Sequence, residues 1–196
     1  MLATQRIVLA SQSPRRKQLL EWAEVPFEII LQPTDESYPD HLDIASIPVH
    51  IARNKALAVQ QGATYTSLTW PLPILAADTV VVLDNTIIGK PASRQEAIDT
   101  LGRLSGKQHQ VITGVVILHQ GQELAFADTT TVWFHELSPE QIAFYVDKYQ
   151  PYDKAGAYAI QEWIGVTGIR KVDGDFYNVM GLPVSRVVQA LRQLPG

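Results

Sequence analysis

The chain has 196 residues, of which 46% are hydrophobic and 18% are charged, with 12 Gly and 12 Pro. This is the length and composition of an ordinary globular domain and excludes a disordered, collagen-like or coiled-coil protein. The net charge of -4 provides no global basic field for nucleic acid, and the absence of cysteine excludes disulfides, thiolate zinc sites and a cysteine nucleophile. A binding site for a polyanion must therefore be local.

The early elements of the chain predict alternating strands and helices. Ser13 can cap a helix that has Pro14 at its first position, with Leu19 and Leu20 on its buried face. The stretch 74–83 is almost continuously apolar, as is typical of a central strand covered on both faces. Elements expected in this half are strands at 7–10, 27–31 and 74–83, a helix from Pro48 to about Gln61, a loop over 33–43 and a linker over 62–73.

Turn and capping signals organise the second half. Asp84-Asn85 and Gln120-Gly121 predict tight turns, while Ser93 with Glu96 and Ser138 with Gln141 predict capping boxes. Elements expected here are a strand at 86–88, a helix to Gly106, a hairpin of 109–118 with 123–134, a helix from Ser138, a short helical or irregular piece to Gln161, a second hairpin of 168–172 with 176–177, and a helix from Pro183. This order predicts an α/β fold with one long antiparallel portion.

No stretch of the sequence predicts a membrane segment. The apolar run 7–10 is too short for a signal peptide or a membrane span. The run 74–83 contains Asp78 and Thr79, which a bilayer would penalise. We therefore expect a cytoplasmic protein that does not act at a membrane.

The segment from Ser11 to Arg16 is a candidate phosphate site. It places two hydroxyls, free backbone N–H groups and two guanidiniums at a helix N-terminus, where the helix dipole favours an anion. Arg15 and Arg16 are unfavourable at this positive end of the helix, and a bound anion would offset that cost. The alternative is a plain Ser-Pro cap with exposed arginines.

Asp78 is the most conspicuous acid, because it interrupts a buried strand and a buried charge without a partner is costly. A metal-binding or general-base role would explain it, as would an ion pair with a nearby lysine. Asp35 and Glu36 lie in a proline-flanked loop, either as solvated acids or as further ligands of an oxygen-only Mg²⁺ or Mn²⁺ site. The five histidines are scattered and do not have zinc spacing.

Lysines recur beside small or kinking residues, at Lys55, Lys90 and Lys154. Each is by default an ordinary surface lysine. Several cations near a phosphate cap and one buried acid would nevertheless suit a nucleoside triphosphate with a divalent ion, where catalysis is largely positioning and charge neutralisation.

These motifs, taken in order, resemble the Maf (septum-formation) family of nucleoside triphosphate pyrophosphatases. The matching segments span nearly the whole chain and are 9–16, 53–56, 77–81, 89–91, 104–107, 113–115 and 153–161. The resemblance implies a single domain over 1–196, with a mixed elongated sheet, flanking helices and two lobes around a cleft, similar to the inosine-triphosphate pyrophosphatases. It also implies hydrolysis of a nucleoside triphosphate to the monophosphate and pyrophosphate with a divalent metal, and a link to nucleotide housecleaning and cell division arrest.

The resemblance also assigns roles to individual residues. Asp78 becomes the general base or metal-bound acid that readies water, with Glu36 as its metal partner. The residues expected to bind substrate are Ser11, Arg15, Arg16, Lys55, Thr79, Lys90, Lys154 and Gln161. Of these, Arg15, Thr79 and Gln161 match the subgroup that resembles dTTP/UTP pyrophosphatases.

Base selectivity is expected to depend on Gln161, because its amide offers both a donor and an acceptor to the edge shared by thymine and uracil. The alternative is a glutamine that merely ties its loop down. Two other functions also stay open: a nucleotide-binding regulator of septum formation without turnover, and a pyrophosphatase of the 7-methyl-GTP subgroup.

A nucleic-acid partner is disfavoured by the net charge and the lack of a wider basic stripe. A homodimer is expected, mainly from the resemblance. Trp70, Trp133 and Trp163 are candidates for an exposed apolar patch, although burial in the core is the commoner fate of a tryptophan.

Overall fold

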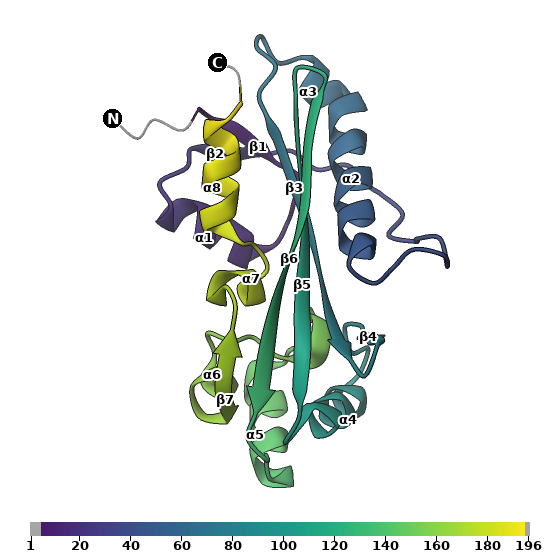
Figure 1. Cartoon of the computed structure of the whole chain (residues 1–196), viewed down its shortest axis with the longest axis vertical. Helices are drawn as coiled ribbons and strands as arrows, with labels where there is room; N and C mark the ends of the chain where they lie inside the picture. The colour runs from purple at the N-terminus through teal and green to yellow at the C-terminus, as the bar shows by residue number, and fades with distance from the viewer. Residues whose placement is uncertain (1–4, 195–196) are drawn as a thin grey trace. The chain divides into compact units, whose positions relative to one another are not determined.

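The structure, a computed structural model, describes residues 5–194, and these divide into two compact units. Unit 1 comprises residues 5–78, 113–128 and 181–194, and unit 2 comprises residues 79–112 and 129–180. Each unit is discontinuous in sequence, because three long strands contribute residues to both. Figure 1 labels the elements named below.

The elements follow the chain from β1 to α8. Those wholly in unit 1 are β1 (Ile7–Leu9), α1 (Pro14–Trp22), β2 (Phe27–Ile29), α2 (Ser46–Gln61), α3 (Ala63–Thr66) and α8 (Val184–Arg192). The strands shared between the units are β3 (Ile74–Leu83), β5 (Gln108–His119) and β6 (Gln122–Phe134). Those wholly in unit 2 are β4 (Thr86–Ile88), α4 (Arg94–Leu104), α5 (Pro139–Tyr149), a 3-10 turn η1 (Ala155–Ala157), α6 (Trp163–Gly168), β7 (Ile169–Asp173) and α7 (Phe176–Met180).

The described strands form one mixed sheet in the order β2-β1-β3-β5-β6-β7, with β4 paired to β3. Strand β1 runs parallel to both β2 and β3, whereas β4 is antiparallel to β3 and β7 is antiparallel to β6. The predicted α/β class with a mixed sheet and flanking helices is therefore confirmed. Strand β3 begins and ends where the apolar run predicted.

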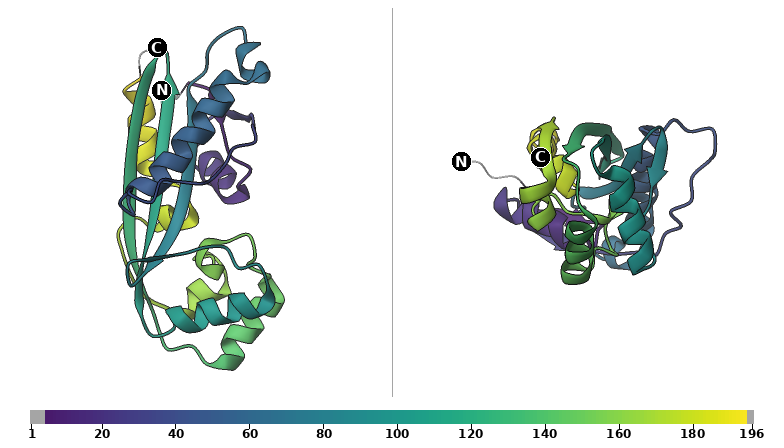
Figure 2. Two further views of the ribbon diagram at one scale, coloured as in Figure 1. Left: turned by 90° about the vertical axis from the view of Figure 1, so that its right-hand side faces the viewer. Right: turned by 90° about the horizontal axis from the view of Figure 1, so that it is seen from below.

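In unit 1 the sheet is covered on both faces, which explains its apolar strands. One face presents Val8 and Ala10 to the buried side of α2, where Ala52, Ala56 and Val59 lie in the same core cluster. The alternate residues of β1, Ile7 and Leu9, are equally buried. Helices α1 and α8 lie on the opposite side of the strands from α2 (Figures 1 and 2). Because successive strand residues point to opposite faces, a sheet covered twice needs an unbroken apolar sequence.

Gly114 on β5 permits an unusually close contact with the first turn of α2. A Cβ atom at this position would lie 2.2 Å from the backbone nitrogen of Val49 and 2.3 Å from the carbonyl carbon of Pro48. Only glycine leaves room for backbone at that distance. The segment Thr113-Gly114-Val115 is thus explained by the packing of α2.

Helix α2 begins earlier than predicted, and the segment after it is not only a linker. The helix begins at Ser46, two residues before Pro48, because proline lacks only an N–H that the first helical turn leaves unpaired. Asp43 supports this start by accepting hydrogen bonds from the backbone N and the hydroxyl of Ser46, at 3.0 and 2.6 Å. The expected linker after Gly62 contains the short helix α3.

In unit 2 the second predicted hairpin, of 168–172 with 176–177, is wrong. Strand β7 pairs with the distant β6 instead, with Val132 opposite Val172. Residues 176–180 form α7, which begins where the Asp175 carboxylate accepts a hydrogen bond from the Tyr177 backbone N at 2.7 Å. The Asp-Gly turn signal was present, but the aspartate that follows it starts a helix.

Of the two capping boxes predicted in unit 2, one is confirmed and the other is only half formed. Ser138 and Gln141 form a complete reciprocal capping box at the start of α5. Ser93 caps α4 by accepting from the Glu96 backbone N, but the Glu96 carboxylate turns to the backbone N of Ala92 rather than to Ser93. Among residues 5–194, no helix has both the length and the apolar character needed to cross a membrane.

Candidate functional site

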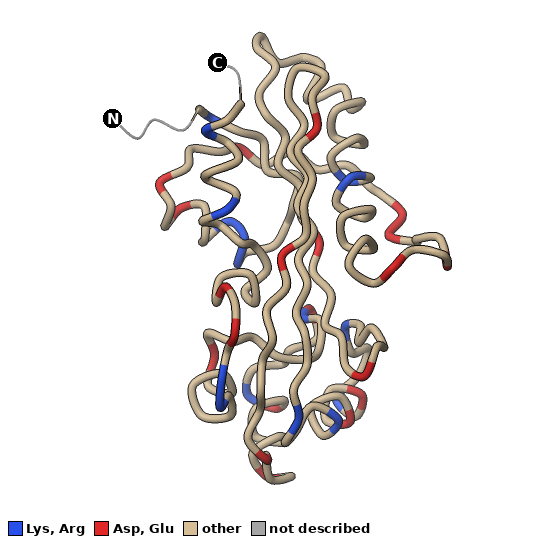
Figure 3. The backbone as a smooth tube through the Cα atoms, in the orientation of Figure 1, with Lys and Arg blue, Asp and Glu red and all other residues tan. Residues whose placement is uncertain are grey.

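The N-terminus of α1 is built as the sequence predicted. Ser13 is the N-cap, its hydroxyl accepts a hydrogen bond from the Arg16 backbone N, and Pro14 occupies the first helical position. The Ser11 hydroxyl accepts a hydrogen bond from the Ser13 backbone N at 3.2 Å, so the two serines shape the turn together. Figure 3 shows that Lys and Arg positions are dispersed among Asp and Glu along the described chain, so anion binding depends on local groups such as these.

Arg16 does not fit the alternative of a plain cap with exposed arginines. Its side chain is buried, and its Nε donates to the carbonyl oxygen of Gly181 at 2.8 Å. Its Nη1 donates to the Ala77 carbonyl oxygen at 2.8 Å and to the Ser11 hydroxyl at 3.1 Å. Burial lowers the pKa of this guanidinium, while the nearby negative charge of Asp78 acts in the opposite direction. Arg16 thus joins the α1 turn to the backbone that immediately precedes Asp78.

Asp78 lies at the middle of β3, where the buried strand becomes half-exposed. Its Oδ1 is 2.8 Å from the Nζ of Lys55, which projects from α2. The same Nζ is 2.7 Å from the Glu36 Oε1 of the preceding loop. One ammonium group therefore bridges the two acids that the sequence nominated, and it compensates their mutual repulsion.

Unit 1 thus assembles six of the predicted site residues, which are Ser11, Arg15, Arg16, Glu36, Lys55 and Asp78. The arrangement offers guanidinium, ammonium and hydroxyl donors beside a pair of carboxylates. Within the described residues, no group of three or more His, Asp or Glu side chains forms a ready metal cage. Two adjacent carboxylates do suit Mg²⁺, which protein sites hold through one or two carboxylates while substrate phosphates and water complete the shell.

Unit 2 carries the other four, which are Thr79, Lys90, Lys154 and Gln161. Lys90 and Gln161 are exposed, whereas Lys154 is buried and pairs with Asp153 at 2.8 Å and with Glu162 at 3.6 Å. The backbone N of Gly156 donates to the Gly89 carbonyl oxygen at 3.2 Å, so the segment of Lys90 is tied to the segment of Lys154. These two motifs, remote in sequence, are neighbours within unit 2.

The segment 153–162 is here called the base loop, because the resemblance implies that its Gln161 selects the nucleobase. It is anchored by side chains that sequence reasoning did not single out. His109 Nε2 lies 2.7 Å from the Tyr158 hydroxyl, inside an aromatic cluster with Phe134. The hydroxyl of Tyr145 accepts a hydrogen bond from the Ala159 backbone N at 3.1 Å. Among residues 5–194, the Gln161 amide forms no hydrogen bond, so other groups hold the loop in place. A single sequence carries no signal for these anchors beyond an apolar pattern.

His109 should make the stability of the protein depend on pH. Burial lowers its pKa to about 4, from about 6.5 in an unfolded chain. Between these values the unfolded chain binds a proton that the native protein does not, so stability falls as the pH drops through this range and is full above it. At pH 5 the loss from this group is about 2 kcal/mol.

We expect His109→Gln, which can still bond the Tyr158 hydroxyl, to flatten this dependence. Urea unfolding at pH 7 and pH 5 measures the effect. The exposed His135 provides the control, since His135→Gln should retain the wild-type difference between the two pH values. An equal loss of stability in His109→Gln and in the wild type would contradict the assignment.

The fold is that of a mixed α/β protein whose acids and cations gather near the N-terminus of α1. We call this cluster the charged centre, and its members are Arg16, Glu36, Lys55 and Asp78. A family model described as Maf-like protein matches residues 6–194. The chain belongs to the Maf family.

Close relatives share one name, dTTP/UTP pyrophosphatase. The chain is 46% identical over 188 residues to the protein of Parabacteroides distasonis, covering 95% of both chains. It is 47% identical over 188 residues to that of Porphyromonas gingivalis, covering 95% of this chain and 93% of the relative. It is 47% identical over 191 residues to that of Bacteroides fragilis, covering 96% of both chains. A solved structure of the Staphylococcus aureus Ham1 protein aligns with a TM-score of 0.43 and 14% identity, covering 66% of this chain and 72% of that chain.

Proposed function

We propose that this protein is a pyrophosphatase that hydrolyses dTTP and UTP to the monophosphate and pyrophosphate. The observation that carries the proposal is the bridge from Lys55 to Asp78 and Glu36, built beside the capped N-terminus of α1 in a chain 46–47% identical to dTTP/UTP pyrophosphatases. In the reaction, an oxygen of water bonds to the α-phosphorus, the bond from that phosphorus to the bridging oxygen breaks, and pyrophosphate leaves.

Asp78 suits the role of the group that accepts the proton of the attacking water. Its side chain is 16% exposed at the middle of β3, and Lys55 Nζ lies 2.8 Å from one of its oxygens. A general base positioned in this way contributes about 10²–10⁴-fold to a rate. Ser11, Arg15 and Lys55 would bind phosphate oxygens, and Arg16 would hold the turn from which the first two act.

Glu36 and Asp78 would hold a divalent cation, Mg²⁺ or Mn²⁺, together with phosphate oxygens of the substrate. When bound, the cation supplies neutralisation of the charge that develops on the phosphates. Lys90 and Lys154 are also proposed to bind phosphate, and Arg15, Thr79 and Gln161 are proposed to select the base.

Analysis of products tests this function. Purified protein is incubated with UTP and Mg²⁺ or Mn²⁺, with and without excess chelator. We expect UMP and pyrophosphate, loss of turnover in chelator, and recovery when metal is restored. UDP with phosphate would assign another reaction, and no product would favour a nucleotide-binding regulator. Turnover that persists in chelator would eliminate the metal role of Glu36 and Asp78.

Gln161→Ala should narrow the preference for dTTP and UTP over GTP, ATP and 7-methyl-GTP more than it slows the shared phosphate chemistry. Sites built to bond a substrate edge reject analogues that leave their groups unpaired, by up to about 10⁴–10⁵. Values of kcat/KM across these nucleotides provide the measurement. A guanine nucleotide preferred by the wild type, or an unchanged profile in the variant, would refute the role of Gln161.

We also propose a homodimer in the cytoplasm as the working form. Trp70 is 76% exposed, whereas Trp133 and Trp163 are half-buried, with Lys171 4.5 Å above the Trp133 ring and Phe144 4.9 Å from that of Trp163. Trp70 is therefore the tryptophan best suited to a contact with a second copy. Light scattering at micromolar concentration should give the mass of two chains, and a monomer mass would rule the dimer out.

A further inference from the structure

The base loop is attached to one phenol on both sides of Gln161. Tyr145, which is fully buried on α5, accepts a hydrogen bond from the Ala159 backbone N at 3.1 Å. Its own O–H donates to the Oε2 of Glu162. The two anchored residues stand two positions before and one position after Gln161. A single hydroxyl thus uses both its acceptor and its donor capacity on this short segment.

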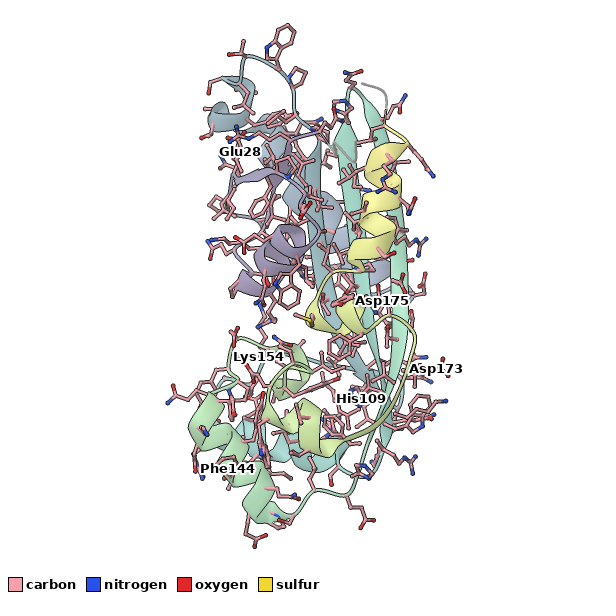
Figure 4. All side chains as sticks on the ribbon, turned by 90° about the vertical axis from the view of Figure 1, so that its left-hand side faces the viewer. Glu28, His109, Phe144, Lys154, Asp173 and Asp175 are labelled. Carbon is pink, nitrogen blue, oxygen red and sulfur yellow. The ribbon has the colours of Figure 1, made fainter. Side chains whose placement is uncertain are left out.

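The far side of Glu162 is also occupied. Its Oε1 lies 3.6 Å from the Nζ of Lys154, which comes from the start of the same loop. Figure 4 labels Lys154 and, on α5, Phe144, the residue before Tyr145. The loop is therefore closed on itself through Lys154 and Glu162, and Tyr145 fastens the closed segment to α5.

We propose that Tyr145 is a positioning residue for base selection, which fixes the backbone around Gln161 and so sets the position from which its amide meets a base. The inference depends on the proposed function, because it concerns the choice among nucleotides. The Gln161 amide has donor and acceptor ends, and cytosine presents the reverse of the edge shared by thymine and uracil. A loose backbone would let the amide shift until it matched either edge, so discrimination requires a backbone that holds the amide at one position relative to the base.

The test compares Tyr145→Phe with Tyr149→Phe. Both changes remove one hydroxyl from α5, and the two rings are stacked with centroids 5.0 Å apart. We expect Tyr145→Phe to reduce the ratio of kcat/KM for UTP over CTP by about 10-fold or more, while kcat for UTP changes much less. Tyr149→Phe should retain the wild-type ratio. A folded Tyr145→Phe protein with the wild-type ratio would overturn the proposal, as would an equal loss of the ratio in both variants.

A second measurement reports on the contact without using activity. Hydrogen exchange of the Ala159 amide should accelerate at least about 10-fold in Tyr145→Phe and stay unchanged in Tyr149→Phe, because only the first change removes its acceptor. If Tyr145→Phe does not fold, Glu162→Ala should reduce the UTP/CTP ratio and Glu162→Gln, which still accepts from the phenol, should restore most of it. Equal ratios in these two variants would also overturn the proposal.

Different results would overturn the proposed function and the role of Tyr145. A wild-type protein that hydrolyses neither dTTP nor UTP overturns the proposed function and, with it, this role in base choice. Normal UTP hydrolysis with an unchanged ratio in Tyr145→Phe overturns only the role of Tyr145.

Discussion

Replacing Asp78 with Asn should lower kcat for dTTP and UTP by about 10²–10⁴-fold and leave the fold intact. The amide keeps the size of the side chain and can still accept the hydrogen bond from Lys55 Nζ, now 2.8 Å from Oδ1. It cannot accept the proton of an attacking water, and it is a poor ligand for Mg²⁺. Steady-state rates with UTP, together with thermal unfolding of both proteins, provide the measurement.

Asp84→Asn is the matched control for this experiment. Asp84 follows the end of the same strand, is exposed, and has a positive φ of 50° that asparagine tolerates. It should retain wild-type activity, which would show that loss of a carboxylate near β3 is not itself harmful. Activity close to wild type in a folded Asp78→Asn protein would remove Asp78 from the mechanism.

Arg16→Met should lower the free energy of unfolding by several kcal/mol. This is a large share of the total, which is about 5–15 kcal/mol for a typical domain. The guanidinium donates to the carbonyl oxygens of Ala77 and Gly181 and to the Ser11 hydroxyl. Each buried acceptor left without a donor costs about 1–3 kcal/mol. Unfolding by urea or heat measures the loss.

The control is Lys17→Met on the same helix. Lys17 is exposed, and its ion pair with Glu21 spans 3.8 Å on the surface, where such pairs contribute at most about 1 kcal/mol. Its stability should stay near that of the wild type. An Arg16→Met protein no less stable than Lys17→Met would contradict a supporting role of the buried guanidinium.

The elements that the sequence predicted correctly are those whose structure depends on residues close together in the chain. The continuous apolar run of β3, the tight turn at Asp84-Asn85 and the reciprocal cap of α5 each depend on a few adjacent side chains. The failure at the second hairpin depends on a distant partner. Nothing near β7 indicates that it pairs with β6 rather than with the segment after Gly174, because register between remote strands is set by the assembled sheet.

The candidate site divides in the same way. The cap at Ser13 and the unusual acid at Asp78 are visible as local patterns in the sequence. The family resemblance predicted roles for Lys55 and Glu36, and the structure places these two side chains in contact. The burial of Arg16 was not expected, because its acceptors are carbonyl oxygens of residues 61 and 165 positions away. Tyr145 gave no signal beyond an aromatic on a helix, since its hydrogen bonds depend on how α5 packs against the base loop.

The glycine at position 114 gives the charged centre a dependence on geometry that its charges do not reveal. Helix α2 is in backbone contact with β5 at Val49, and Lys55 projects from the same helix less than two turns further on. The distance between α2 and the sheet is therefore as short as it is because residue 114 has a hydrogen atom where other residues have a side chain. A methyl group at position 114 would push α2 away from β5 and would move the Lys55 ammonium group away from the Glu36 and Asp78 carboxylates. Residue 114 thus affects the charged centre although it bears no functional group.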